Sequence, residues 1–289
     1  VMYSNGEEAT LEPLRELLTL YNEDLSPDLN LDWLDMSLDA AIEYIGEQNK
    51  WSFNLPTLAN VVPGVDAGQL IEIGARPNTG KTSFHASMVA GPNGFARQGA
   101  KCVVLVNEEK QERVRTRYIT AATGMSDTEF ARKKDQALAS YNEVRDNIKL
   151  YDSIGQDMAW VERVAKTYRP DVLVLDMGDK FATMKSNLRQ DEILKKNVIH
   201  AREIGKKYDC AVFYMSQLSA EAEGKTVLNQ SMMEGSKTGK AAEADLMILI
   251  AANPHLEGSN AQDPQRHLNI VKNKLTGWHG RLHRNLNNQ

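Results

Sequence analysis

Cysteines and long apolar runs are scarce in this sequence. Its 289 residues include two cysteines, Cys102 and Cys210, and each lies inside a short apolar run. Isolated cysteines of this kind are typical of buried residues in a reducing compartment, and they do not indicate a disulfide framework or a metal site. No apolar run approaches the ~18 residues that a membrane-spanning helix requires, and no secretory signal opens the chain. We therefore expect a soluble, cytoplasmic protein without a membrane partner.

Internal repeats and low-complexity tracts are absent as well. Hydrophobic residues make up 42% of the chain and charged residues 25%, which are the proportions of an ordinary globular protein. The chain begins with Val1 rather than methionine, so we expect a trimmed protein or a part of a longer one.

Charge is distributed unevenly along the chain. Residues 1–50 contain twelve acidic and two basic residues, and because the whole chain has a net charge of −5, the remainder carries +5. Apolar residues at helical spacing predict two short helices in this acidic segment, over 7–24 and 36–49, with Ser37 as the N-cap of the second. We therefore divide the chain into an acidic helical arm, residues 1–50, and a main domain, residues 51–289. The arm is too small for a core of its own and is expected to dock on the main domain or on a neighbouring subunit.

The main domain alternates apolar runs with helical patterns. The apolar runs predict strands at 70–73, 102–106, 171–176, 210–215 and 246–251, and a hairpin at 266–274 and 280–286. This alternation is typical of an α/β domain with a mainly parallel sheet that helices cover on both faces. The polar stretch 219–243 predicts a long loop, and such a loop in a compact domain is usually functional. The turn signals in 51–68 predict a loop before the first strand, and the stretch 126–143 predicts a single helix.

The first of these strands leads into a glycine-containing turn, Gly80-Lys81-Thr82 and a helix, which is the P-loop arrangement. Backbone N–H groups of the turn and of the helix N-terminus form a nest for phosphates. Lys81 would neutralise the β- and γ-phosphates of ATP or another NTP or dNTP, and the Thr82 hydroxyl would bind Mg²⁺. Ala75 stands where the first glycine of the motif is usual. The candidate nucleotide-binding residues are Ala75, Arg76, Pro77, Asn78, Thr79, Gly80, Lys81, Thr82 and Ser83.

Polar side chains follow three further strands, at the sheet edge where ligands of α/β proteins bind. Asp176 is the candidate Walker B carboxylate that holds Mg²⁺ through water, although Asp179 is near enough to compete. Glu108 is the candidate general base and Glu109 its alternative. A solvated helix N-terminus would also favour glutamate at both positions. Gln217 is either a sensor of the γ-phosphate or an ordinary loop residue.

Basic residues gather in two loops that are expected at the same sheet edge. One loop follows Asp176 and the other follows Gln217. They are either contacts for the phosphate backbone of DNA or ordinary solvated loops. They contain almost no aromatic residues, which argues against a platform for base stacking. The candidate DNA-binding residues are Lys180, Lys185, Arg189, Lys225, Lys237 and Lys240.

Together these motifs resemble those of the DnaB-type replicative helicases, and their spacing is closest to the helicase domains of phage replication proteins. The segment from Gly74 to Thr82 resembles the family's P-loop, which also lacks the first glycine. The resemblance covers residues 50–286. The other matching motifs are Glu108 to Gly124 with Arg117, Asp176, Ser216-Gln217-Leu218, Ser231 to Asp245, and Lys272-Asn-Lys-Leu-Thr-Gly277.

The resemblance implies a RecA-like ATPase domain that forms a ring, usually a hexamer, on single-stranded DNA in a bacterial or phage-infected cytosol. A primase or polymerase would be a further partner, and no primase-like zinc motif is present. ATP and Mg²⁺ would lie between subunits, with Lys272 and an arginine finger supplied by the neighbour. The acidic arm would pack on the adjacent subunit.

The arginine-finger position departs from this family, because it holds Lys274. Lysine is a point charge and lacks the planar fork of arginine. Either Lys274 suffices, or Arg281 or Arg284 takes the role, or hydrolysis is slow. Besides a helicase motor, the sequence therefore leaves open a RecA-type recombinase and a nucleotide-switched assembly or loader protein with little turnover.

Overall fold

The computed structural model of the chain describes residues 36–46, 50–181, 189–234, 239–253 and 265–285. The chain divides into two compact units, Val1–Gly46 and Glu47–Gln289. The described part of the first unit contains helix α2 (Leu38–Gly46), whose large apolar side chains are exposed. The Oγ of Ser37 accepts a hydrogen bond from the backbone N of Ala40 at 3.2 Å, so the N-cap is confirmed. The helix predicted at 7–24 lies outside the described residues, and the domain boundary at residue 50 stays a prediction.

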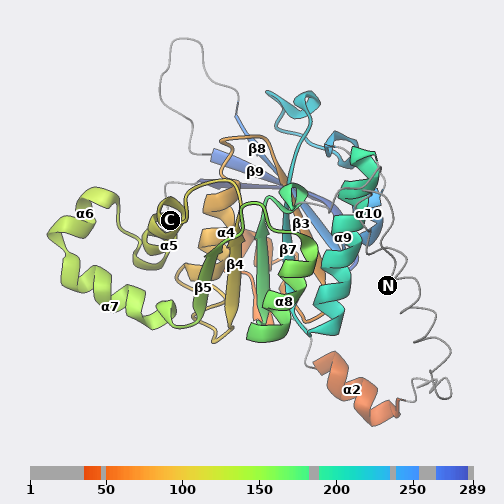
Figure 1. Cartoon of the computed structure of the whole chain (residues 1–289), viewed down its shortest axis with the longest axis horizontal. Helices are drawn as coiled ribbons and strands as arrows, with labels where there is room; N and C mark the ends of the chain where they lie inside the picture. The colour runs from red at the N-terminus through yellow and green to blue at the C-terminus, as the bar shows by residue number, and fades with distance from the viewer. Residues whose placement is uncertain (1–35, 47–49, 182–188, 235–238, 254–264, 286–289) are drawn as a thin grey trace, which may run out of the picture. The chain divides into compact units, whose positions relative to one another are not determined.

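The second unit is built on a mostly parallel sheet of eight strands in the order β10-β9-β8-β3-β7-β6-β4-β5 (Figure 1). The six strands from β8 to β5 in this order are parallel, and β9 and β10 form an antiparallel extension beside β8. The predicted strands and the predicted α/β fold are thus confirmed. The strands are β3 (Leu70–Ala75), β4 (Cys102–Val106), β5 (Ile148–Asp152), β6 (Val172–Asp176), β7 (Ala211–Gln217), β8 (Leu246–Ala252), β9 (Gln265–Asn273) and β10 (Gly280–Asn285).

Helices cover both faces of the central strands. On one face α4 (Lys81–Ala90) and α5 (Gln111–Thr123) pack against side chains such as Val104, and on the other α8 (Met158–Tyr168) and α9 (Gln190–Lys207) pack against neighbours such as Val103. Successive residues of β4 therefore alternate between two cores, which explains why the parallel strands are continuous apolar runs. None of the helices in the described part of the chain has the length and apolar content of a membrane span.

Two regions differ from the predicted elements. The stretch 51–68, predicted as a loop, contains a short helix and a small two-stranded sheet. These elements are β1 (Trp51–Ser52), α3 (Pro56–Ala59) and β2 (Gly64–Val65). The single helix predicted over 126–143 is interrupted, because the backbone leaves the helical region at Lys133, where φ is −122°. The two resulting helices are α6 (Asp127–Arg132) and α7 (Lys134–Arg145).

The polar segment 219–243 is folded in its described part, which corrects the prediction of a structureless loop. It contains the short helices η2 (Ala220–Ala222) and η3 (Gln230–Met232) and the helix α10 (Gly239–Glu243). Leu228 and Met232 pack with Met247 of β8 in a small third core. The apolar residues of the segment stand singly or in isolated pairs such as Val227-Leu228 and Met232-Met233, so they show neither a helical nor a strand period.

The topology brings the ends of four strands together. Because β3, β4, β6 and β7 are parallel, the P-loop, Glu108, Asp176 and Gln217 all lie at the edge formed by their carboxyl ends. The end of β9 lies at the opposite edge, because β9 runs antiparallel to β8.

Candidate nucleotide-binding site

The P-loop joins β3 to α4 through two residues with left-handed backbone conformation. Asn78 has a φ of 60°, and Gly80, the N-cap of α4, has a φ of 102°. Asparagine and glycine adopt this region at the least cost, which explains their place in the turn. A pocket of about 490 Å³ lies against the loop, a volume typical of small-molecule sites. It is lined by Arg76, Pro77, Asn78, Gly80, Lys81, Thr82, Ser83, Glu108, Glu109, Arg113, Arg117 and Arg266.

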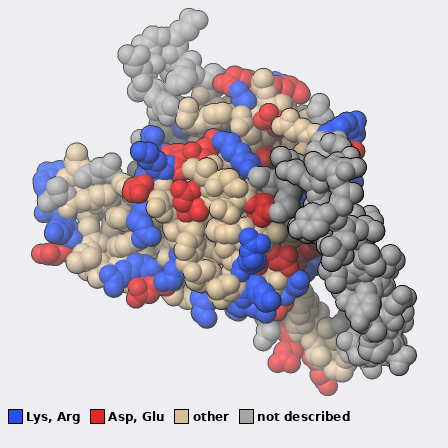
Figure 2. Space-filling view, viewed as in Figure 1, with Lys and Arg blue, Asp and Glu red and all other residues tan. Residues whose placement is uncertain are grey.

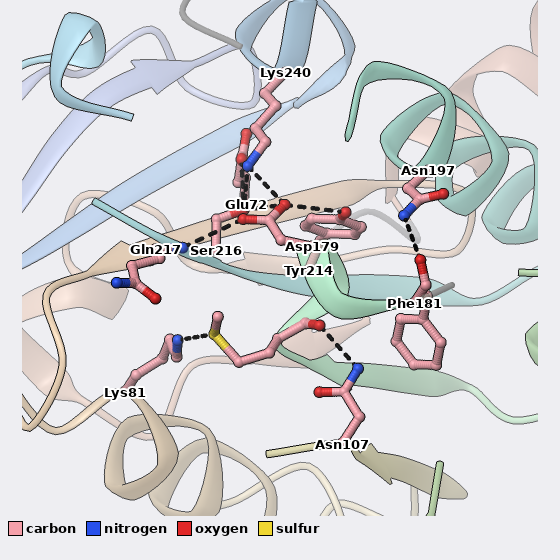
Figure 3. Close-up of polar contacts among 11 residues, drawn as sticks. Glu72, Lys81, Asn107, Asp179, Phe181, Asn197, Tyr214, Ser216, Gln217 and Lys240 are labelled. Atoms are coloured by element: carbon pink, nitrogen blue, oxygen red, sulfur yellow. Dashed lines mark hydrogen bonds and ion pairs between the residues drawn. The ribbon is translucent and has the colours of Figure 1, made fainter. Parts of the chain in front are cut away.

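Lys81, the first residue of α4, has a weak hydrogen-bond partner in this structure. Its Nζ contacts the Sδ of Met177, and a thioether is a poor acceptor (Figure 3). Burial lowers the pKa of Lys81, although the carboxylates of Asp176 and Glu108 act in the opposite direction. Phosphate oxygens would be much stronger partners for this ammonium group. The environment of Lys81 therefore fits a bound nucleoside triphosphate.

Asp176 is buried at the end of β6 and contacts a histidine that the sequence analysis did not single out. The Nε2 of His85 lies 3.6 Å from Asp176 Oδ2, and the Nδ1 of the same ring lies 2.9 Å from Tyr118 Oη. Burial acts to raise the pKa of Asp176, but His85 and Lys81 hold it below its ordinary value. Within the described residues, Asp176 Oδ1 has no hydrogen-bond partner. A charged carboxylate with a free oxygen, in contact with His85 one turn after Thr82 on α4, fits the hydration shell of a Mg²⁺ ion.

Glu108 and Glu109 both line the pocket, but their partners differ. Glu108 is 42% exposed and pairs with the Nζ of Lys180 at 3.0 Å. Glu109 is 27% exposed and is held by Arg117 at 2.7 Å and by Arg113 at 3.3 Å. A general base must reach a water molecule and accept its proton. Glu108 meets this requirement better, because a single exposed lysine is a weaker competitor than two arginines.

Gln217 ends β7 beside the start of the P-loop. It lies opposite Ala75, and the backbone N of Leu218 donates to Ala75 O at 3.1 Å. The guanidinium of Arg76 donates to Leu218 O at 3.0 Å and to Glu223 Oε2 at 2.8 Å. These contacts fasten the P-loop directly to the segment that follows Gln217.

A cluster of buried polar residues lies beside Gln217 (Figure 3). We call it the buried cluster, and its members are Glu72, Asp179, Tyr214, Ser216 and Lys240. The cluster was not predicted from the sequence, although Glu72 points to buried polar contacts. It interrupts the apolar run of β3, and a charge inside such a strand requires buried partners. His85 gives no comparable signal, because a lone histidine on a helix is common.

The candidate DNA-binding residues lie in unlike surroundings. Lys180, Arg189 and Lys225 have exposed side chains. Lys240 is fully buried, which corrects its assignment to DNA contacts, because a buried ammonium cannot meet a backbone phosphate. Lys185 and Lys237 lie outside the described residues. On the face of the molecule in Figure 2, basic and acidic residues are interspersed rather than gathered in one basic strip.

Lys272 and Lys274 lie at the sheet edge opposite the P-loop. Lys272 pairs in register with Met247 near the start of β8, and its Nζ donates to Ala242 O at 3.2 Å. Lys274 is 48% exposed, with its Nζ 3.7 Å from Asp245 Oδ1. A strand rises ~3.3 Å per residue, so the length of β3 separates these lysines from the P-loop of the same chain. Arg281 lies in β10, and its guanidinium donates a hydrogen bond to Thr226 Oγ1 at 3.2 Å.

The parallel sheet, its P-loop and the carboxylates at neighbouring strand ends define a RecA-like P-loop fold. Residues 48–223 match the model of the family described as AAA domain, and the chain belongs to that family.

Two solved structures share the fold. A DnaB-like replicative helicase, described with its interactions with primase, has a TM-score of 0.70 at 18% identity, covering 95% of this chain and 71% of that one. A second structure, described as an ATPase domain, has a TM-score of 0.68 at 17% identity, covering 96% of this chain and 95% of that one. The resemblance to DnaB-type helicases is thus confirmed at the level of the fold. The comparison with curated proteins gives no match.

Proposed function

We propose that this chain is the motor domain of a ring-forming replicative DNA helicase, which hydrolyses ATP or another NTP while it moves along single-stranded DNA. The observation that carries the proposal is the division of the site between two sheet edges. The P-loop and Glu108 lie at one edge, whereas Lys272 and Lys274 lie at the other. These lysines can complete a nucleotide site only on a neighbouring copy of the chain.

The P-loop would bind the triphosphate. Backbone N–H groups at the start of α4 would hold the phosphates, and Lys81 would neutralise the charge that develops on them. Thr82 and Asp176 would hold Mg²⁺, which when bound neutralises charge on the phosphate oxygens. The free Oδ1 of Asp176 and the weak present partner of Lys81 support these assignments.

Hydrolysis would use Glu108 as the general base. Its carboxylate would leave Lys180, orient a water molecule and accept the proton as the water attacks the γ-phosphate. Gln217 would contact the γ-phosphate and pass its presence to the segment 219–243. Lys272 and Lys274 of the adjacent copy would stabilise the transferred phosphoryl group, which requires that a lysine serve where an arginine finger is usual.

The partners are proposed from the structural relatives and from charge. One relative is described with primase, so a primase or a polymerase is the proposed protein partner of this chain. Lys180, Arg189 and Lys225 are the exposed basic residues that we propose for contacts with the DNA backbone. The assembly would be a homo-oligomeric ring, with a hexamer as the expected size.

Two assays test the proposal. ATP hydrolysis by the purified chain is measured with and without a single-stranded oligonucleotide, and strand displacement is measured on a forked duplex. The expected result is DNA-stimulated hydrolysis together with displacement. Hydrolysis that DNA does not stimulate would overturn the helicase function, and strand exchange without displacement would favour a recombinase.

One observation favours a second function. Lys274 replaces the expected arginine and pairs with Asp245 of its own chain. A site completed by this residue would bind nucleotide without rapid turnover, as in a nucleotide-switched loader. Nucleotide-dependent assembly with no measurable hydrolysis would identify that function.

A further inference from the structure

A lysine is fully buried where the segment 219–243 returns to the sheet. Lys240 lies in α10, and lysine is among the residues that are least often found inside a protein. Its Nζ donates to Asp179 Oδ1 at 2.6 Å and to Ser216 Oγ at 3.3 Å. A buried ammonium requires such partners. The base of the segment is therefore fixed to the short helix η1 (Gly178–Lys180) by an ion pair and to β7 by a hydrogen bond.

Asp179 connects this ion pair to Gln217. It lies in η1 (Gly178–Lys180), directly after the strand that carries Asp176. Besides Lys240, its carboxylate accepts from Tyr214 Oη at 3.2 Å and from the backbone N of Gln217 at 3.4 Å (Figure 3). One carboxylate thus joins the segment 219–243 to the residue that ends β7 beside the P-loop.

The close packing of this region leaves it little freedom. A Cβ added to Gly178 would lie 2.5 Å from the ring of Tyr214, so η1 sits directly on β7. The second buried carboxyl, Glu72, accepts from Ser216 Oγ at 3.0 Å, which ties β3 to the same group of residues. Lys240 donates to Asp179 and to Ser216, and Ser216 donates to Glu72, so the position of Lys240 affects how both carboxyl groups are arranged.

We propose that Lys240 is a positioning residue: it holds Asp179 against the backbone of Gln217 and so couples the state of the nucleotide to the segment 219–243. The inference rests on the proposed function, because it needs Gln217 to face the γ-phosphate and the segment to contact DNA. Lys240 itself touches neither ligand.

The coupling is measured as a ratio of affinities. The dissociation constant of a fluorescent single-stranded oligonucleotide is measured by anisotropy, once with a non-hydrolysable ATP analogue and Mg²⁺ and once with ADP. For the unaltered chain we expect a ratio of roughly 5 to 150, the usual range for coupled sites. Lys240→Met is expected to bring the ratio to about 1, and to lower kcat while KM for ATP changes by less than about twofold.

Two further variants keep the test decisive. Lys225→Met removes a charge from the same segment at an exposed position, so it should weaken DNA binding equally in both nucleotide states and leave the ratio unchanged. Lys240→Met combined with Asp179→Asn removes both members of the buried ion pair, and such neutral replacements are usually tolerated. This double variant replaces the single one if the latter does not fold, and its ratio should also be about 1.

The outcomes separate the two proposals. A normal ratio in the Lys240→Met variant, or in the double variant, overturns the role of Lys240 alone. A ratio that also collapses in Lys225→Met overturns it too, because loop charge would then be the cause. If the unaltered chain does not bind the oligonucleotide at all, the proposed function itself fails.

Discussion

The two flanks of the P-loop are built from the same kinds of residue in opposite ways. On the side of β4 and α5, the Glu108 side chain is 42% exposed and forms an ion pair with Lys180, which is 45% exposed. Towards β7, Glu72 and Lys240 are fully buried and Asp179 nearly so. Exposed ion pairs exchange partners at little cost, whereas buried ones are costly to break. The first flank is therefore suited to an arriving ligand and the second to fixing the relative positions of strands.

The largest effect is expected at the residue that both flanks adjoin. Under the proposed function, Lys81→Ala should lower hydrolysis by more than ~10³-fold, because it removes the ammonium that would neutralise the phosphates. Steady-state turnover measures this loss, and circular dichroism serves as the control for folding. If the variant hydrolyses ATP at a normal rate, the pocket is not the site of the reaction.

The exposed flank is tested at its two glutamates. Glu108→Gln should lower kcat by roughly 10²-fold or more and leave nucleotide binding intact. Glu109→Gln is the matched control, since Arg117 and Arg113 engage that carboxylate, and it should lower kcat less. If kcat falls further in the Glu109 variant than in the Glu108 variant, Glu109 is the general base.

The buried and exposed lysines offer a direct contrast in stability. Lys240→Met should reduce the free energy of unfolding by about 3–5 kcal/mol, because it leaves a buried carboxylate without its partner. Lys180→Met should change it by less than about 1 kcal/mol, because the pair with Glu108 is exposed. Urea unfolding of both variants measures the difference. Equal losses would show that the flanks do not differ as described.

The pH dependence of the free energy of unfolding should depend on the buried flank, through Glu72, and not on the exposed flank. Burial raises the pKa of Glu72 from 4.5 to about 7, and the negative charge of Asp179 acts in the same direction. The folded state therefore keeps a proton that the unfolded state releases. Its stability should fall as the pH rises from about 4.5 to about 7 and should then level off, with a total loss of about 3 kcal/mol.

Glu72→Gln should remove this part of the pH dependence. Urea unfolding between about pH 5 and pH 8 gives the comparison, with Glu223→Gln as an exposed control. If the free energy of unfolding of the Glu72 variant depends on pH as it does in the unaltered chain, a group other than Glu72 causes the dependence.

The pattern of apolar residues predicted the strands of the central sheet, and the reason is physical. Strands covered on both faces are continuous apolar runs, and the P-loop is contiguous in sequence, so both leave local signals. Glu108, Asp176 and Gln217 were predictable because parallel topology brings strand ends to one edge.

Contacts between distant segments left no such signal. His85 of α4 meets Asp176 of β6 through a topology that no local pattern encodes, and Lys240 meets Asp179 only after β7 and the segment 219–243 have folded back. Lys240 therefore looked like any other basic loop residue. Its buried position is seen only in three dimensions, where its ammonium group meets Asp179 and Ser216 from elements that are distant in the sequence.

The antiparallel strand β9 has a consequence for how copies can assemble under the proposed function. Because the P-loop and Lys272 occupy opposite edges of the sheet, a productive contact must bring unlike surfaces of two copies together. Head-to-tail contacts give a closed ring or an open filament according to the rotation between copies. Two inactive variants, one altered at Lys81 and the other at Lys272, should then restore activity when mixed, at the interfaces where their intact halves meet.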